Sequence, residues 1–149
     1  MAEITRKELI LALIGAGTTP RLAGIDLMAL DMTRLDMTGA SARAAKFTAA
    51  TLREAILINA NLSFSDMTTV QAVGLDLNGA NLTGVNFSSA TLTSARLTNA
   101  NLTNAILNGA NLTGANMKGA IVTGLKFNES TTWPDGKKGS QGNPVSYTT

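Results

Sequence analysis

The stretch Asn78-Gly-Ala-Asn-Leu-Thr-Gly-Val-Asn-Phe87 repeats one arrangement of residues every five positions. A small residue, a polar residue and a large apolar residue follow one another in Ala80-Asn81-Leu82, and the same order returns in Ala100-Asn101-Leu102. Neither the 3.6-residue period of a helix nor the two-residue alternation of a strand produces a period of five. Because a fixed internal period is the signature of a repeat architecture, the stretch predicts a chain that turns a corner at every fifth residue.

The five-residue period extends far to both sides of this stretch. Steps of five from Leu82 give 22 successive centres between Leu22 and Phe127 without an insertion or a deletion, and all are large apolar residues except Ala42 and Ala72. A second apolar register lies two residues before each centre and is mostly alanine from position 40 to position 120. The sequence therefore predicts one continuous solenoid whose interior is filled by these two registers.

This pattern resembles the pentapeptide-repeat family, whose motif is roughly Ala-(Asp/Asn)-Leu-x-x, and the resemblance covers residues 20 to 127 in register. It implies an all-β fold, a right-handed quadrilateral β-helix with four repeats per coil and with both apolar registers pointing inward. Phe47, Phe87 and Phe127 are forty residues apart, so a twenty-residue coil stacks all three on one side. The ending Thr-Thr-Trp-Pro-Asp-Gly at 131–136 also resembles the ends of cyanobacterial members of the family.

The chain divides into three segments. Residues 1–19 form an N-terminal capping helix and a linker, and residues 20–127 form the pentapeptide-repeat β-helix of 22 repeats. Residues 128–149 form a C-terminal cap around Trp133, followed from residue 137 by a tail rich in Gly, Ser and Asn without an apolar period. Such a composition predicts a mobile tail.

The N-terminal helix is predicted from a capping box, in which Thr5 and Glu8 each satisfy a free backbone amide of the other. The helix runs to about Ile14, before Gly15 and Gly17. Its apolar face is expected to cover the first coil, because an open coil edge would pair with other molecules. That predicted face consists of Leu9, Ile10, Leu13 and Ile14.

A signal peptide is the alternative for this segment, with Arg6-Lys7 as its charged region. The apolar run that follows is only six residues long, Glu8 adjoins it, and no clear Ala-x-Ala cleavage site follows, so the capping helix is favoured. No segment approaches the length of a transmembrane helix. We expect a cytoplasmic location, with an exported compartment as the alternative.

The composition excludes several kinds of chemistry. The sequence contains no Cys and no His, which removes disulfides, thiolate nucleophiles, the usual zinc sites and imidazole catalysis. Asp26, Asp31 and Asp36 are five residues apart, so a four-sided coil places each on a different side. The same period puts Asp66 over Lys46 in the column of Asp26, and Asp76 between Ile56 and Arg96 in the column of Asp36, where both are expected to be solvated surface charges. We therefore expect no catalytic residue, no metal site and no cofactor, and predict that the protein is not an enzyme.

The favoured function is a non-catalytic interaction or structural module with an unidentified protein partner, present as a monomer or an end-to-end homodimer. Neither nucleic acid nor membrane is an expected partner, because the basic residues are scattered and aromatic residues make up only 4% of the chain. Apolar residues at outward positions are the candidates for partner contact. These are Ile56 and Ile58 on one side and Ile106 and Ile121 on two others.

Two alternative functions belong to other classes. Some members of the family protect DNA gyrase from quinolones by imitating DNA, which needs a strongly negative rod, whereas the formal net charge here is +2. An ice-binding face is suggested by Thr83, Thr103 and Thr123, which fall in one column, but their strand neighbours form no second threonine file.

Two local expectations concern the solenoid itself. Around residues 63–75, where Ser63-Phe-Ser-Asp66 departs from the repeat, the favoured interpretation is ordinary sequence drift, and a bulge or a distorted side is the alternative. Asparagines at the residue before the centre, such as Asn61, Asn81 and Asn101, fall in one column and predict an amide ladder along the stack.

Overall fold

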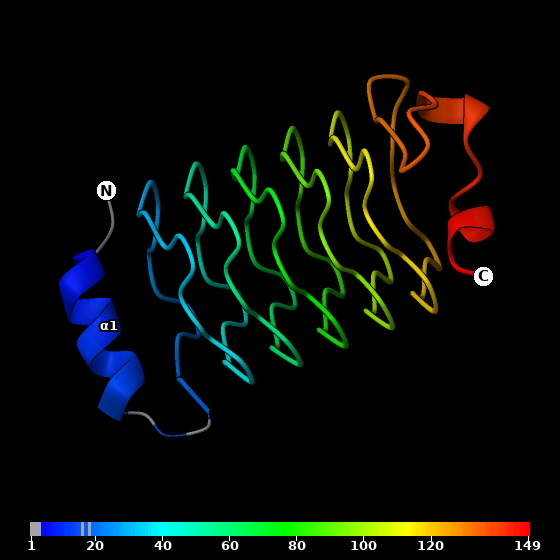
Figure 1. Cartoon of the computed structure of the whole chain (residues 1–149). Coiled ribbons are helices and arrows are strands. Elements are labelled where there is room, and N and C mark those ends of the chain that lie inside the picture. The colour runs from blue at the N-terminus through cyan, green and yellow to red at the C-terminus, as the bar shows by residue number, and fades with distance from the viewer. Residues whose placement is uncertain (1–3, 16, 18) are drawn as a thin grey trace.

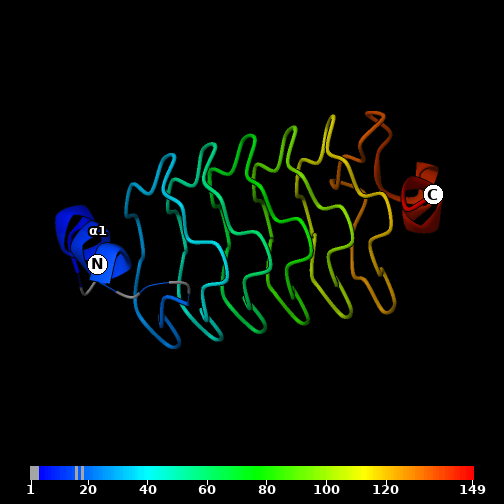
Figure 2. The same ribbon diagram turned by 60° about the horizontal axis from the view of Figure 1, so that its bottom comes forward.

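The computed structural model describes residues 4–15, 17 and 19–149. Among these residues it contains the α-helix α1 (Arg6–Gly15) and two short 3-10 helices, η1 (Gly139–Gln141) and η2 (Pro144–Tyr147). Between α1 and η1 the chain winds into a stack of coils, with α1 at one end and η2 at the other (Figures 1 and 2). Within the described part of the chain, no helix has the length and hydropathy that crossing a membrane requires.

Each coil has four sides and takes twenty residues. Parallel bridges join the residue before each centre to the residue twenty positions later, once on every side. The sides are named here 1 to 4 after their first bridge residues, which are Arg21, Asp26, Asp31 and Asp36 in that order. The predicted right-handed quadrilateral β-helix is thereby confirmed.

Hydrogen bonds run along the solenoid axis from coil to coil. The amide of Leu82 donates to the carbonyl of Asn101 at 2.8 Å, and the amide of Asn101 donates back to the carbonyl of Ala80 at 2.9 Å. Each corner is closed within one repeat, as where the amide of Val85 donates to the carbonyl of Leu82 at 3.1 Å. Because every repeat forms the same bonds, the register is set by the five-residue period alone.

The second residue after each centre turns the corner in the left-handed backbone region. From Gly24 to Gly124 the φ angle at these positions lies between 54° and 72°. Glycine adopts this region without strain, whereas a residue with a Cβ is disfavoured there by roughly 1–2 kcal/mol. Large side chains at these corners are therefore unusual, and Phe64 is one of them with φ at 60°.

The interior is filled by the two predicted apolar registers. Leu82, Leu102 and Leu112 are fully buried, as is the alanine register between them. The expected phenylalanine column forms on side 2, where Phe47 and Phe87 are fully buried and Phe127, in the last coil, is half-buried. The narrow bore holds these side chains tightly, which explains why the core contains leucine and alanine and few rings.

The N-terminal cap is confirmed in its capping box but not in all of its covering face. Thr5 N donates to Glu8 Oε2 at 2.7 Å, and Glu8 N donates to Thr5 Oγ1 at 3.2 Å. Leu9 is fully buried, and Ile10 and Leu13 are half-buried. Ile14, expected on the same face, is 77% exposed. It follows Leu9 by five residues, about 140° around the helix, and so points away from the coil.

Arg6 ties α1 to the open edge of the first coil. Its guanidinium donates to the carbonyl of Asp31 and, at 2.9 Å, to the carbonyl of Thr33. These carbonyls belong to side 3 at the end of the stack, where a preceding coil would otherwise supply the donors. One side chain therefore replaces two rungs of the missing ladder and protects this edge from pairing with another molecule.

The β-helix continues beyond Phe127, where the sequence predicted its end. Thr132 bridges Asn111, twenty-one residues earlier, so the last coil contains one inserted residue before side 3. The amide of Leu112 donates to the carbonyl of Thr132 at 2.8 Å. The inserted residue shifts the repeat by one position, so this additional repeat cannot be found by counting in steps of five.

The C-terminal segment folds back over Trp133, whereas its composition predicted a mobile tail. Trp133 is fully buried, its Nε1 donates to the carbonyl of Gly139 at 2.7 Å, and its indole meets Phe127 edge-on at 5.0 Å. The ring of Tyr147 also stacks on the indole, with ring centroids 5.7 Å apart. A single aromatic residue thus orders a segment that lacks any apolar period.

Candidate functional site

The three aspartates of the first coil do not converge. Asp26, Asp31 and Asp36 lie on sides 2, 3 and 4, and each accepts a hydrogen bond from the amide two residues later at 2.9 Å. These bonds are side-chain turns that fix the local backbone. Within residues 4–15, 17 and 19–149, no group of three or more acidic residues is placed to hold a metal ion.

Local hydrogen bonds also lower the pKa values of two of these carboxyls, those of Asp31 and Asp36. Hydrogen bonds from the side chain and backbone of Thr33 lower the pKa of Asp31, and those of Thr38 lower the pKa of Asp36. A lowered pKa keeps both groups ionised near neutral pH. A proton-transfer role would require a raised pKa, so the shifts run against acid catalysis.

Asp66 and Asp76 occupy the columns that the period predicts for them. Burial, the largest single influence, raises the pKa of Asp66, but hydrogen bonds from Thr68 and Thr48 together hold it below the ordinary value. Asp76, expected to be a solvated surface charge, is instead only 8% exposed. Arg96, one coil later on side 4, lies over it with Nη1 3.3 Å from Oδ2. Asp76 is therefore a nearly buried carboxylate with an ion-pair partner in the next coil.

The asparagines before the centres form turns and not the amide ladder predicted from their column. The Oδ1 of Asn81 accepts from the amide of Thr83 at 3.1 Å and from its hydroxyl at 2.7 Å. Asn101 makes the same pair of bonds with Thr103, at 3.0 and 2.6 Å. In the described structure no side-chain bond joins one of these asparagines to the next. Each Oδ1 accepts a hydrogen bond from the amide two residues later. In an amide ladder that amide would be left to solvent.

Two hollows of the described structure lie at the N-terminal end of the solenoid. One, of about 380 Å³, lies at the junction of α1 and the first coil and is lined by residues including Leu13, Pro20 and Arg21. A second, of about 300 Å³, adjoins it beside Asp36 and Thr38. Each contains one charged residue, so neither brings together the acid and base that catalysis needs.

The four isoleucines proposed as partner contacts lie on three sides and form no single patch. Ile56 and Ile58 share side 4 and are half-buried, and Ile106 on side 2 is half-buried as well. Ile121 on side 1 is 50% exposed. Each stays a separate candidate, and Ile121 offers the largest apolar fraction to a partner.

Sequence reasoning missed the surface pair Arg43 and Phe64. Phe64 is 55% exposed at the corner between sides 1 and 2, and the guanidinium of Arg43 lies over its ring, 4.8 Å from the centroid. The alternative of a bulge at residues 63–75 is excluded, because the bridges keep their normal register there and the Phe64 amide donates its regular hydrogen bond to the carbonyl of Thr83. The detectable signal was a large aromatic residue at a corner position that elsewhere holds mostly Gly, Ala, Asn or Ser.

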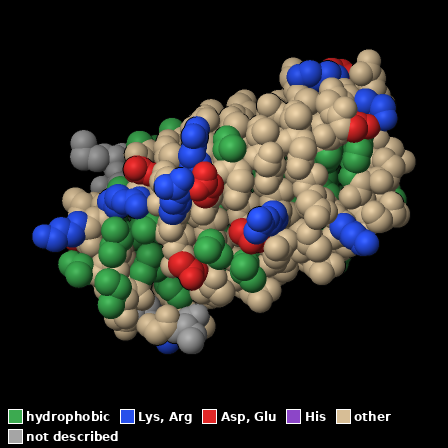
Figure 3. Space-filling view, in the orientation of Figure 1, with side chains coloured by type: hydrophobic (Ala, Val, Ile, Leu, Met, Phe, Trp, Pro, Cys, Tyr) green, Lys and Arg blue, Asp and Glu red, His purple; other side chains and the backbone are tan. Residues whose placement is uncertain are grey.

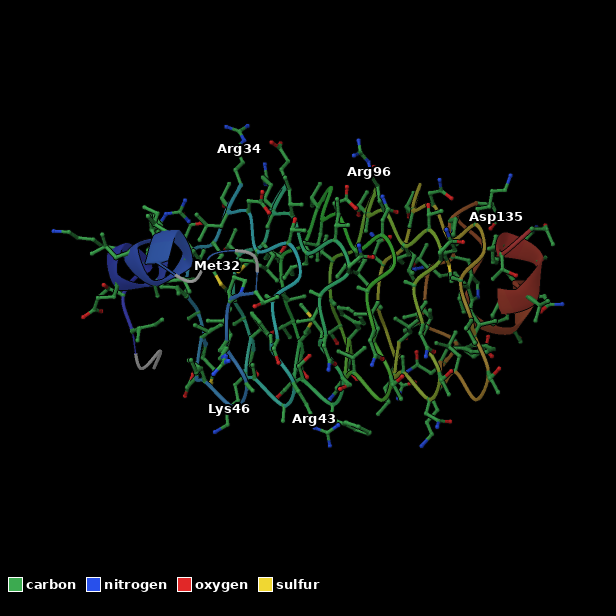
Figure 4. The ribbon with its side chains drawn as sticks, turned by 90° about the horizontal axis from the view of Figure 1, so that it is seen from below. Met32, Arg34, Arg43, Lys46, Arg96 and Asp135 are labelled. Atoms are coloured by element: carbon green, nitrogen blue, oxygen red, sulfur yellow. The ribbon has the colours of Figure 1, made fainter. Side chains whose placement is uncertain are left out.

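Charged side chains of both signs are interspersed on the face seen in Figure 3, and hydrophobic side chains gather over α1. Within α1, Leu11 is 60% exposed and Ile14 is 77% exposed. Figure 4 shows that Arg43 and Lys46 project in the opposite direction to Arg34 and Arg96. The surface is therefore a set of separate, differently built sides.

Comparison with known proteins agrees with this architecture. The sequence model of the family described as pentapeptide repeats matches eight copies, over residues 36–71, 71–99 and 95–131. A search of curated proteins finds no match.

Solved structures similar to the chain include three from different sources. QnrB1, a plasmid-mediated fluoroquinolone resistance protein, is 19% identical over 77% of this chain and 65% of its own, with a TM-score of 0.41. Rfr23, a pentapeptide-repeat protein of the cyanobacterium Cyanothece 51142, is 33% identical over 70% of this chain and 64% of its own, with a TM-score of 0.36. A pentapeptide-repeat protein of the Arabidopsis thaliana thylakoid lumen is 27% identical over 85% and 83% of the two chains, with a TM-score of 0.39.

The chain thus spans 65% and 64% of the lengths of QnrB1 and Rfr23. The eight matched copies cover most of the solenoid, and their period is the one that the coil bridges follow. The chain belongs to the pentapeptide-repeat family.

Proposed function

We propose that the protein is a rigid, non-catalytic interaction module that presents the sides of its solenoid to a protein partner. The observation that carries this proposal is the unbroken ladder of bridges from Arg21 to Lys126, built on fully buried centres. About five coils at a strand spacing of about 4.8 Å make a rod of roughly 25 Å. A surface already held in place loses little conformational freedom when it binds, which favours association.

The arrangement of polar groups supports a role without catalysis. The carboxylates of the first coil lie on three sides, and the lowered pKa values of Asp31 and Asp36 keep these two groups ionised. Hydroxyls such as that of Thr83 donate to a neighbouring asparagine of the same strand. These groups stabilise the coil and are not poised for proton transfer or nucleophilic attack.

Affinity capture with surface variants tests the proposal. The tagged protein is used to capture partners from cells of its source organism, in parallel with Ile56→Asp, Ile106→Asp and Ile121→Asp. Asn104→Asp is the matched control, because it adds the same charge at an exposed corner of side 1. We expect a protein that is captured by wild type and the control and lost in one isoleucine variant whose circular dichroism is unchanged. Failure to capture any protein by any variant would contradict the proposal.

We also propose that a second copy of the chain can bind end to end at the C-terminal coil. In the described structure the amides of Val122 and Gly124 on side 1 have no hydrogen-bond acceptor, and Ile121 beside them is half exposed. An unpaired edge beside apolar side chains favours strand pairing. Light scattering should show a dimer that Ile121→Lys converts to a monomer, and a wild-type monomer at all concentrations would contradict it.

The alternative of gyrase protection by DNA mimicry lacks a suitable side. Side 2 alternates Asp26, Lys46 and Asp66, and side 4 pairs Asp76 with Arg96. A DNA mimic needs a continuous file of negative charge along one side. A supercoiling assay with quinolone would support this alternative only if the protein protects gyrase at low concentration.

The ice-binding alternative requires free threonine hydroxyls in a flat file. Thr83 and Thr103 do stack on side 1, but each hydroxyl donates to the Oδ1 of its own asparagine. Their orientation is therefore set by the turn and not by a bound water layer. Thermal hysteresis measured in a solution of the protein would support ice binding.

A further inference from the structure

The corner between sides 1 and 2 carries an exposed aromatic side chain in an unusual place. Phe64 is 55% exposed and has a φ of 60°. Other coils have at this corner Gly24, Ala44, Gly84, Asn104 and Gly124. The left-handed conformation and the exposed ring both disfavour Phe64 on grounds of stability. The fold itself therefore does not account for a phenylalanine at this position.

The ring is held in one orientation by the neighbouring coils. In the next coil, a Cβ placed on Gly84 would lie 2.8 Å from ring atoms Cδ1 and Cε1, so only glycine allows the ring to rest there. In the preceding coil, the guanidinium of Arg43 lies 4.8 Å from the ring centroid. A ring fixed in advance loses little rotational freedom on binding.

The guanidinium of Arg43 has its hydrogen-bonding capacity available. Arg34 donates to Glu54 and Arg96 donates to Asp76, whereas Arg43 has no hydrogen-bond acceptor among the described residues. Stacking over a ring uses the flat face of the guanidinium and leaves the N–H groups at its edge directed outward. This fork matches the two oxygens of a carboxylate.

The charge of side 1 also favours an acidic ligand. Across its five-residue segments from Pro20 to Gly124, side 1 carries Arg21 and Arg43 and no Asp or Glu. On side 2, Asp66 of the next coil already accepts hydrogen bonds from Thr48 and Thr68. Lys46, on side 2, projects in the same direction as Arg43 (Figure 4). A negatively charged partner would therefore meet no repulsive carboxylate on side 1 itself.

We propose that Arg43 and Phe64 form a docking site for an acidic segment of a partner protein. A carboxylate of that segment accepts two hydrogen bonds from Arg43, and an adjacent apolar side chain packs on the exposed part of Phe64. This inference rests on the proposed interaction function and names the chemistry of the partner. Arginine and aromatic side chains are the residue types that most often dominate interface energy.

A nucleic acid is the less suitable occupant. A nucleic-acid backbone is bound by several Lys or Arg residues that follow successive phosphates. Side 1 has two arginines, and the remainder of its bridge file from Ser41 to Ile121 is uncharged. The pair Arg43–Phe64 fits one carboxylate beside one apolar group.

Selection from a displayed library of random peptides tests the proposal directly. Peptides are selected on the immobilised wild-type chain, and the most enriched sequence is synthesised for titration. We expect enriched peptides with Asp or Glu next to a large apolar residue, and affinity that falls as salt concentration rises. Arg43→Gln and Phe64→Ala should each weaken binding by about tenfold or more.

Two control variants separate docking from a general effect on folding. Arg96→Gln removes an arginine from side 4, and Thr69→Ala changes another non-glycine corner, where φ is 55°. Both should keep wild-type affinity. Phe64→Gly serves as a second ring deletion that removes the disfavoured φ, so it should fold even if Phe64→Ala does not. Circular dichroism and melting temperature check each variant.

Several results would overturn the inference. These are a selection that yields no binding peptide, enriched peptides without carboxylates, and equal affinity for wild type and Arg43→Gln. Tighter binding of a single-stranded oligonucleotide, also lost in Arg43→Gln, would assign the site to nucleic acid. A captured protein that tolerates Arg43→Gln and Phe64→Gly but is lost in Ile121→Asp would refute this site and leave the proposed function standing.

Discussion

The phenol ring of Tyr147 stacks on the indole of Trp133, with centroids 5.7 Å apart and planes inclined by 17°. The hydroxyl of Tyr147 also donates to Asp135 Oδ1 at 2.9 Å, and Lys137 Nζ donates to Asp135 Oδ2 at 2.7 Å. These contacts hold η2 against the turn that follows Trp133. A latch made of Trp133, Asp135, Lys137 and Tyr147 thus secures the end of the solenoid at side 3, whereas side 1 of the last coil stays open in the described structure.

Replacing Tyr147 by alanine should open the latch. The change removes an aromatic stack worth about 0.5–1.5 kcal/mol and the hydrogen bond to Asp135. Trp133 is the only tryptophan in the chain, so its fluorescence reports this position alone. We expect a red shift of the emission and faster quenching by iodide, whereas Tyr147→Phe should keep most of the stack. An unchanged spectrum in Tyr147→Ala would show that the stack does not shield Trp133.

Gly142 is required by close approach, because its φ of −102° is open to any residue. A Cβ at this position would lie 2.1 Å from Trp133 Cδ1. Gly142→Ala should therefore displace the tail or the indole and destabilise the cap by about 1–3 kcal/mol. Thermal unfolding followed by Trp133 fluorescence measures this, with Ser140→Ala as an exposed control. Equal melting temperatures for the two variants would contradict the packing seen here.

The latch should weaken in acid. The hydrogen bond from the Lys137 side chain is the main cause that lowers the pKa of Asp135 to about 2, below its ordinary value of 3.8. Because the pKa of Asp135 is lower in the folded protein, its ionised form stabilises the latch at a pH above the ordinary pKa of 3.8. This contribution is lost as the pH falls from about 4 towards about 2. Trp133 emission should shift over this range in wild type, and Asp135→Asn should remove most of that shift. The same acid transition in both proteins would exclude Asp135 as its origin.

Ser65 carries a buried hydroxyl that makes no hydrogen bond in the described structure. It occupies the inward column of Ala45 and Ala105, where the narrow bore provides no acceptor. Ser65→Ala should therefore stabilise the protein by about 1–3 kcal/mol, the usual effect of removing an unsatisfied buried polar group.

Urea unfolding measures the effect at Ser65. Ser63→Ala is the matched control, because the Ser63 hydroxyl donates to Asn61 Oδ1 at 2.8 Å and its loss should destabilise. A decrease in stability in Ser65→Ala would indicate that the hydroxyl has a partner in solution.

The role of the asparagines can be tested by changing one atom. Asn101 acts through Oδ1, which accepts from the amide and the hydroxyl of Thr103. Asn101→Asp keeps this acceptor, as Asp31 does for Thr33, and should change the free energy of unfolding by less than about 0.5 kcal/mol. Asn101→Leu removes the acceptor and should destabilise by about 1 kcal/mol. An amide ladder would instead make the aspartate variant as unstable as the leucine variant, because a carboxylate cannot donate.

The five-residue period is enough to predict the architecture of this protein. The five-residue period places Leu82, Leu102 and Phe87 inward at every step, and each corner closes with a hydrogen bond inside one repeat. Because these interactions are local and identical along the chain, a sequence argument needs no knowledge of distant contacts to predict coil, register and columns. It correctly put Arg96 in the column of Asp76 and Trp133 at the end of the stack.

Other features of the protein depend on tertiary contacts that the period does not encode. Asp76 is paired with Arg96 of the next coil, Phe64 is flanked by Gly84 and Arg43, and the C-terminal segment folds back so that Tyr147 stacks on Trp133. Each depends on the direction of one particular side chain towards a residue in another coil or beyond the stack. A repeat specifies which residues share a column, but the packing of individual side chains specifies which of them are shielded, fixed or available to a partner.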